Sequence, residues 1–103
     1  MFGWKKKADI AAWAKAVYGK EIKNPEHESE DRLSQLTTFM LQQHQRIIVE
    51  SSKIVRATKN AETRKGRVDL CHQHYQEMLT LKPFCNRDQL AMIKLAEDAM
   101  KGI

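Results

Sequence analysis

Residues 30–59 read EDRLSQLTTFMLQQHQRIIVESSKIVRATK, a run that contains neither glycine nor proline. This run predicts one helix of roughly 45 Å, longer than a compact chain of 103 residues needs. Its predicted packing stripe consists of Leu33, Leu36, Met40, Ile47 and Ile54. Residues 33, 40, 47 and 54 follow one another at intervals of seven, as in a coiled-coil seam. A long hairpin or a dimeric bundle would explain this length.

Other side chains modify that stripe. Phe39, Ile48 and Val55 widen the apolar face toward the breadth of a bundle helix. His44 and Ser51 interrupt the seam with polar or small groups. We interpret His44 as a polar residue that fixes the register of packing. The alternative is a buried, pH-sensitive contact.

Turn-forming residues set the ends of the first two helices. A helix over residues 6–18 is predicted to end at Gly19, which suits a C-terminal cap. The long helix has two possible starts. Asn24 before Pro25 could cap an early start, and Ser29 before two acidic residues is the second cap. The sequence leaves both open.

Two further helices are predicted in the second half of the chain. One begins at about residue 62 or 67 and ends at Leu81, because Pro83 disfavours the α conformation at the residue before it. The next follows Asn86, which can form a variant capping box with Gln89. Its apolar residues occupy two faces, one with Leu90, Ile93, Ala96 and Met100, the other with Met92, Leu95 and Ala99. A helix of this kind is usually sandwiched between partners, here helices of this chain and of a second subunit.

These patterns predict an all-α fold, a small antiparallel bundle of about four helices with a long hairpin of the second and third helices. No alternating run of strand type is found. We expect one domain, with an amphipathic helix and linker over 1–23 and the bundle over 24–103. We also expect a homodimer, a cytoplasmic location and no transmembrane segment.

Basic residues concentrate around the predicted hairpin turn. The window 46–67 holds seven cations and two acids, a difference of five that equals the net charge of +5 for the whole chain. A patch of this kind would bind nucleic acid through its phosphates, with steep salt dependence and little sequence preference. The seven candidates are Arg46, Lys53, Arg56, Lys59, Arg64, Lys65 and Arg67. A solvated helix face is the alternative, since no aromatic residue lies among them.

Arg67 and His72 have a spacing that resembles the Arg-x4-His element of helical HEPN ribonucleases. In that family the pair handles the scissile phosphate and the 2′-hydroxyl, so the resemblance implies a metal-independent ribonuclease. Five residues, however, correspond to about 140° of helical rotation. Val68 also stands where the family has a polar residue. We do not assign the chain to the family and expect no catalytic residues.

Thiols and imidazoles raise the question of a zinc site. Cys71, His72, His74 and Cys85 have suitable side chains. On one helix, however, Cys71 and His74 share a face while His72 points elsewhere. Cys71 also fits the apolar stripe as a small buried residue. We therefore predict neither a metal site nor a cofactor.

Aromatic residues near the start of the chain are candidates for a partner-binding helix surface. They are Phe2, Trp4 and Trp13. Beside the lysines they could also lie on an anionic membrane. Packing onto the bundle is the favoured alternative, because its apolar stripes need a cover.

The leading functional hypothesis is a non-enzymatic interaction protein: a regulator, adaptor or inhibitor that binds a protein partner through helical surfaces. Its size and style suggest a bacterial or mobile-element origin. Nucleic-acid binding by residues 46–67 is the second hypothesis and the ribonuclease is the third. A phosphate loop, a nucleophile elbow and a metalloprotease helix motif are all missing from the sequence.

Overall fold

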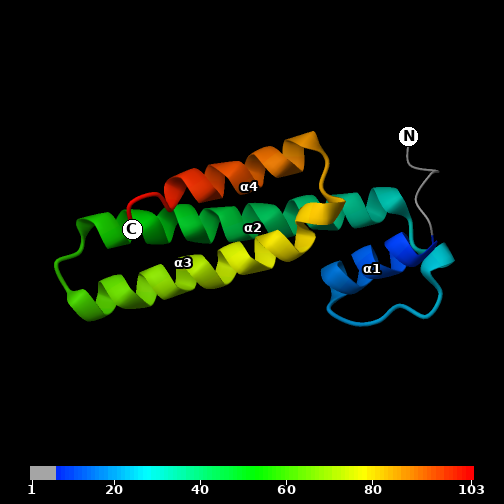
Figure 1. The fold of residues 1–103 in the computed structure, drawn as a ribbon, viewed down its shortest axis with the longest axis horizontal. Helices are drawn as coiled ribbons and strands as arrows, with labels where there is room; N and C mark the ends of the chain where they lie inside the picture. Colours follow the sequence, from blue (N-terminus) through cyan, green and yellow to red (C-terminus); the bar gives the residue numbers. More distant parts are fainter. Residues whose placement is uncertain (1–6) are drawn as a thin grey trace.

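The computed structural model describes residues 7–103, and every regular element in that range is helical. The elements are α1 (Lys7–Tyr18), the 3-10 turn η1 (Pro25–His27), α2 (Glu30–Ala57), α3 (Ala61–Leu81), the 3-10 turn η2 (Lys82–Phe84) and α4 (Arg87–Ala99). Helices α2 and α3 form the predicted long hairpin, and α4 returns along α2 (Figure 1). The molecule measures 51 × 25 × 16 Å. The predicted all-α bundle with a long hairpin is confirmed.

Helix α1 runs in the same direction as α4, the other short helix (Figure 1). It packs beside the first half of α2 and runs the same way as α2, because the connection over residues 19–29 returns along its length (Figure 1). Of the two predicted starts of α2, Ser29 is the cap, since its Oγ accepts from the backbone N–H of Arg32 at 3.3 Å. Pro25 begins only the 3-10 turn η1.

The turn between α3 and α4 confirms the predicted boundaries but not the predicted reason for the first. Helix α3 ends at Leu81, yet Lys82 keeps an α conformation (φ −53°, ψ −42°) despite the proline after it. The chain tightens into η2 and becomes extended only at Cys85. Asn86 and Gln89 form the predicted capping box, with both hydrogen bonds at 2.9 Å.

The predicted seam of α2 is confirmed at Leu33, which is fully buried, and is wrong by part of a helical turn at Met40, Ile47 and Ile54. Leu41 and Ile48 are fully buried and Val55 is 6% exposed, whereas Met40 and Ile47 of the predicted seam remain partly exposed. Small polar residues on the same side, Thr37, Ser51 and Ser52, are also buried. The packing face is centred on side chains that seemed to interrupt or merely widen the stripe, because small residues allow neighbouring helices to approach closely.

Two apolar clusters hold the described part together. The larger joins α2, α3 and α4 and contains Leu41, Ile48, Cys71, Met78, Leu81, Ile93 and Ala96. The smaller joins α1 to the start of α2 and contains Ile10, Trp13, Ala14 and Leu33. Trp13 also stacks on Phe84, with ring centroids 6.0 Å apart and planes 6° from parallel. Helix α1 thus contacts α2 through the smaller cluster and the turn before α4 through this stack.

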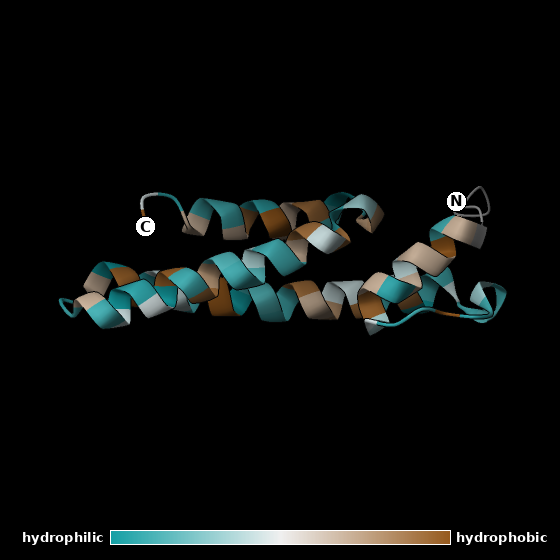
Figure 2. Cartoon of the chain, turned by 60° about the horizontal axis from the view of Figure 1, so that its bottom comes forward, coloured by the Kyte–Doolittle hydropathy of each residue, from teal (hydrophilic) through white to brown (hydrophobic). Residues whose placement is uncertain are grey.

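Helix α4 is not sandwiched within a single chain. Its buried residues are Gln89, Ile93 and Ala96, while Leu90 and Leu95 are 39% and 49% exposed. A second subunit on this side stays a prediction. No helix in the described range is long and apolar enough to cross a membrane. Hydrophilic residues interrupt the apolar residues along each helix (Figure 2).

Candidate functional site

The densest group of chemically capable side chains lies between α2 and α3. The Nδ1 atoms of His44 and His74 are 2.8 Å apart, and their ring centroids are 5.0 Å apart. Glu77, one turn beyond His74, places Oε2 3.4 Å from His44 Nε2 and 4.0 Å from His74 Nδ1. One ligand atom from each of the three residues lies within 4.8 Å of the others. We call these three residues the histidine cluster.

The contacts of His44 define its protonation. Between two Nδ1 atoms, one must donate and the other accept. A proton on His44 Nε2, toward Glu77, leaves His44 Nδ1 free to accept from His74. Burial lowers the pKa of His44, the Glu77 carboxylate raises it, and the electrostatic effect of the neighbouring His74 ring lowers it, so the pKa lies below its ordinary value. In this arrangement the Nδ1 lone pair of His44 points into the cluster.

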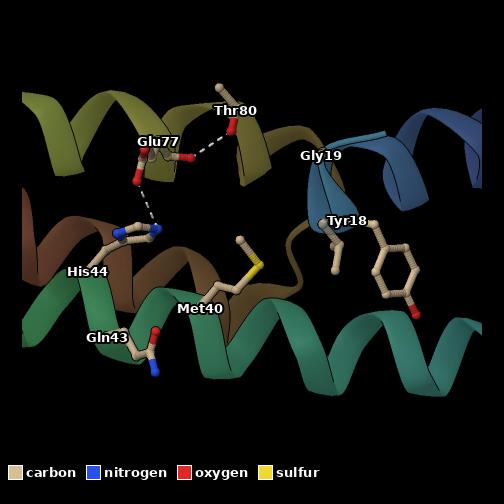
Figure 3. A pocket seen from close by; sticks show the side chains of 9 residues that line it. Tyr18, Gly19, Met40, Gln43, His44, Glu77 and Thr80 are labelled. Atoms are coloured by element: carbon tan, nitrogen blue, oxygen red, sulfur yellow. Dashed lines mark hydrogen bonds and ion pairs between the residues drawn. The ribbon is translucent and has the colours of Figure 1, made fainter. Parts of the chain in front are cut away.

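A pocket of about 330 Å³ opens beside the histidine cluster. Its walls come from Ala16 to Gly19 at the end of α1, from α2 and from α3, with His44 and Glu77 on the wall (Figure 3). Gly19 closes α1 in the left-handed conformation (φ +73°) and donates its N–H to the Lys15 carbonyl at 2.7 Å. The pocket is thus built where the C-terminal end of α1 meets the hairpin.

The sequence alone pointed to different partners for His74. Cys71 is buried and donates to the Ile48 carbonyl at 3.7 Å, and Cys85 donates to the Leu81 carbonyl at 3.2 Å. Burial raises the pKa of both thiols, that of Cys85 to about 11. His72 is exposed. The structure instead brings His74 to His44, thirty positions away in the sequence, which only the register of the hairpin determines.

The seven predicted cations are all exposed, and two of them also form hydrogen bonds within the fold. Arg56 donates to the carbonyls of Ala99 and Lys101 at 2.8 and 2.7 Å, so it caps the end of α4. Arg64 donates to the Thr58 carbonyl at 2.7 Å and so stabilises the turn between α2 and α3. Two of the seven are thus used by the fold, and Arg46, Lys53, Lys59, Lys65 and Arg67 remain for a partner.

Arg67 and His72 are exposed on α3. Their separation of five residues turns the two side chains about 140° apart on a regular helix. No hydrogen bond or ion pair joins them within the described residues. The geometry therefore adds nothing to the ribonuclease hypothesis.

Trp13 belongs to the core and not to an exposed surface. It is 2% exposed, and its Nε1–H donates to Thr37 Oγ1 at 3.0 Å. Thr37 Oγ1 in turn donates to the Leu33 carbonyl at 2.7 Å. The prediction that Trp13 contacts a partner is therefore wrong. The edge of its ring makes the buried hydrogen bond to Thr37, and the face of its ring stacks on Phe84. Phe2 and Trp4 lie outside the described residues.

Among residues 7–103, no segment covers one side of the α2–α3 hairpin beyond the end of α1. Helix α4 lies on the side of α2 that carries Thr38 and Arg56, which it contacts at 2.9 and 2.8 Å. Ile47 is nine residues from each, which at about 100° per residue places it half a turn away. Ile54 is turned about 160° from both by the same count. Both isoleucines are partly exposed.

Helix α3 contributes to the same side. Its Tyr75 contacts Glu97 of α4, and that contact together with burial raises the pKa of Tyr75. Leu70 is five residues away, about 140° around the helix, and is partly exposed. The hydrogen bond from the Cys71 thiol to the Ile48 carbonyl shows that this part of α3 lies beside the part of α2 around Ile48. We call Ile47, Ile54 and Leu70 the open hairpin face.

No family model, no curated protein and no solved structure matches the chain. The inferences below therefore depend on the residues of this chain alone.

Proposed function

We propose that this chain is a non-enzymatic interaction protein whose open hairpin face binds an amphipathic helix of a protein partner. The observation that carries the proposal is the partial exposure of Ile47, Ile54 and Leu70 on the side opposite α4. The end of α1 covers this side of the hairpin only as far as Met40 and His44. A partner helix lying along the rest of the side would cover the three apolar residues. Helix-in-groove binding of this kind uses apolar residues at helical spacing as anchors.

The charges beside the open hairpin face favour an acidic partner. Arg46 and Lys53 directly precede the two isoleucines, and Arg67 lies one turn before Leu70; all three are exposed. Glu50 lies between the two cations of α2 and the exposed Asp69 directly precedes Leu70, so the three cations beside the face exceed these two acids by one. A second copy of the chain would bring the same cations together, which costs free energy, whereas acidic residues flanking a partner's apolar stripe would pair with them.

The test uses two fluorescent model peptides of about 20 residues, long enough to form a helix on binding. Both carry leucine and alanine on one face; one has glutamate on its other positions and the second has lysine. Fluorescence anisotropy against the purified chain measures affinity, and circular dichroism measures induced helicity. We expect the glutamate peptide to bind, to weaken with added salt and to bind better than the lysine peptide.

Two matched variants locate the binding surface. Ile54→Glu puts a charge on the open hairpin face and should weaken binding by at least about tenfold, since a buried unpaired charge costs more than 1.4 kcal/mol. Leu95→Glu makes the same change at an exposed leucine of α4 and should bind like the wild type. Equal binding of both peptides, or an equal loss in both variants, would contradict the proposal. Light scattering on the same samples measures whether the chain is a homodimer. If it is a dimer, and Ile54→Glu makes it monomeric while Leu95→Glu does not, the open hairpin face binds a second copy of the chain instead.

Nucleic-acid binding at the hairpin turn is the second candidate, favoured by the exposure of all seven cations. The appropriate variant changes Lys53, Lys59 and Lys65 to glutamate and keeps Arg56 and Arg64, which hold the fold. If this candidate is right, labelled duplex DNA or single-stranded RNA binds the wild type with a steep salt dependence and does not bind the triple variant. An absence of binding at low salt would leave these lysines as solvated side chains.

A further inference from the structure

We propose that His44, His74 and Glu77 bind one divalent transition-metal ion, with Zn²⁺ as the ion whose ligand chemistry fits best. This inference does not depend on the proposed function, because it concerns a different set of residues. Two imidazole nitrogens and one carboxylate oxygen are common first-row metal ligands, and Zn²⁺ accepts all three. The ligand atoms converge from two helices to within 4.8 Å.

The distances agree with a metal site after a small adjustment. A tetrahedral Zn²⁺ with Zn–N bonds of about 2.0–2.1 Å separates two nitrogen ligands by roughly 3.3 Å. The two Nδ1 atoms are 2.8 Å apart, so the rings must separate by about half an ångström. The Glu77 side chain is 55% exposed and is free to change rotamer toward the ion. The histidine side chains are 12% and 19% exposed, and their helices hold them in place.

The surroundings also favour a cation. The last turn of α1 lines the pocket next to His44 and Glu77. The C-terminal end of a helix carries partial negative charge, which attracts positive ions within about one turn.

The ion would join α2 to α3 and would keep one position open. Three protein ligands leave a fourth tetrahedral position, which water or a small anion would fill from the pocket (Figure 3). By linking two helices at the middle of the hairpin, the bound ion would stabilise the folded state over the unfolded chain.

The experiment measures Zn²⁺ binding by the tag-free full chain, using competition with a chromogenic zinc chelator and isothermal titration calorimetry. We expect one equivalent of Zn²⁺ to bind and to raise the midpoint of thermal unfolding. Co²⁺ is then substituted as a spectroscopic probe. Its visible absorption reports a tetrahedral site, and a thiolate charge-transfer band in the near ultraviolet would reveal cysteine ligands.

Variants separate the proposed ligands from the other metal-binding residues of the chain. Glu77→Gln and His74→Gln should each weaken Zn²⁺ binding by about a hundredfold or more, because even the loss of a supporting residue weakens metal sites by about 10–100-fold. Glu77 is exposed, so its variant should fold normally. His72→Gln changes an exposed histidine of the same helix and should bind like the wild type.

Three results would overturn the inference. They are the absence of a bound equivalent at micromolar protein, binding that survives in Glu77→Gln and His74→Gln, and a cobalt–thiolate band. The third would move the ion to the cysteines.

Discussion

Gln89 joins α4 to α2 through a buried amide, and its replacement by methionine tests how α4 is held. The residue is 2% exposed. Its Nε2 donates to the Ser34 carbonyl, Ser34 Oγ and Thr38 Oγ1 at 3.0, 3.3 and 2.9 Å. Its Oε1 accepts from the Asn86 N–H at 2.9 Å, which completes the capping box. Methionine has a similar length and removes all of these contacts.

The expected cost follows from counting bonds. Two amide hydrogens are shared among three acceptors, so the side chain donates the equivalent of two hydrogen bonds and accepts one. At about 1 kcal/mol net per bond, the loss is roughly 3 kcal/mol. The apolar methionine recovers about 1 kcal/mol by burial, which leaves a decrease of about 2 kcal/mol in the free energy of unfolding. That is a large part of the total stability of a domain this size, which is about 5–15 kcal/mol.

Urea unfolding followed by far-ultraviolet circular dichroism measures this change. With a slope near 1 kcal/mol per molar urea, the midpoint should fall by about 2 M while the slope stays the same. Gln76→Met is the control, because Gln76 is exposed on α3 and should change stability by less than about 0.5 kcal/mol. A double-mutant cycle with Thr38→Val should show coupling. If Gln89→Met were as stable as Gln76→Met, the amide would not anchor α4.

Three other predictions follow from buried or capping contacts. Thr37→Val keeps the size of the side chain but removes the acceptor of the Trp13 indole, so unfolding free energy should fall by about 1–3 kcal/mol in urea titrations; no change would mean that the indole finds water. Arg56→Met should lower the thermal midpoint by removing two bonds to the end of α4, about 1 kcal/mol, whereas Lys53→Met should not. With a pKa of about 11 against an ordinary 9.0, Cys85 has a thiolate fraction about a hundredfold below that of the unfolded chain at pH 7.5. A thiolate of higher pKa is also more nucleophilic, which offsets about tenfold of this loss in reaction rate. Mass spectrometry should therefore show iodoacetamide labelling Cys85 about tenfold more slowly in the native chain than in the unfolded chain, and faster as the pH rises. Equal rates in the two states would contradict the burial of Cys85.

The sequence predicted the helices well because the signals that end them are local. Ser29 and Asn86 cap their helices through their own side chains, and Gly19 ends α1 with a positive φ that glycine adopts without strain. The long run without glycine or proline predicted α2 to within two residues of its observed end. Each of these features depends on interactions within about four positions along the chain.

The packing face of α2 could not be predicted to the same accuracy. A sequence pattern ranks residues by hydrophobicity, so Ile47 and Ile54 seemed to belong to the seam and Ser51 seemed to interrupt it. In the structure the small polar residues are buried, because close contact between helices depends on side-chain size as well as polarity. The same shift leaves the isoleucines partly exposed, and the proposed partner surface follows from that exposure.

The sequence by itself determined the fold class, the ends of the helices, the capping box and the basic balance of the chain, since all of these arise from composition and from short-range contacts. Only the tertiary structure decided that His44 meets His74 and Glu77, that Arg56 and Arg64 serve the fold, and that Trp13 is buried. The physical reason is register. When two helices pack side by side, a displacement of one residue turns a side chain by about 100°, so no local pattern can specify which side chains meet.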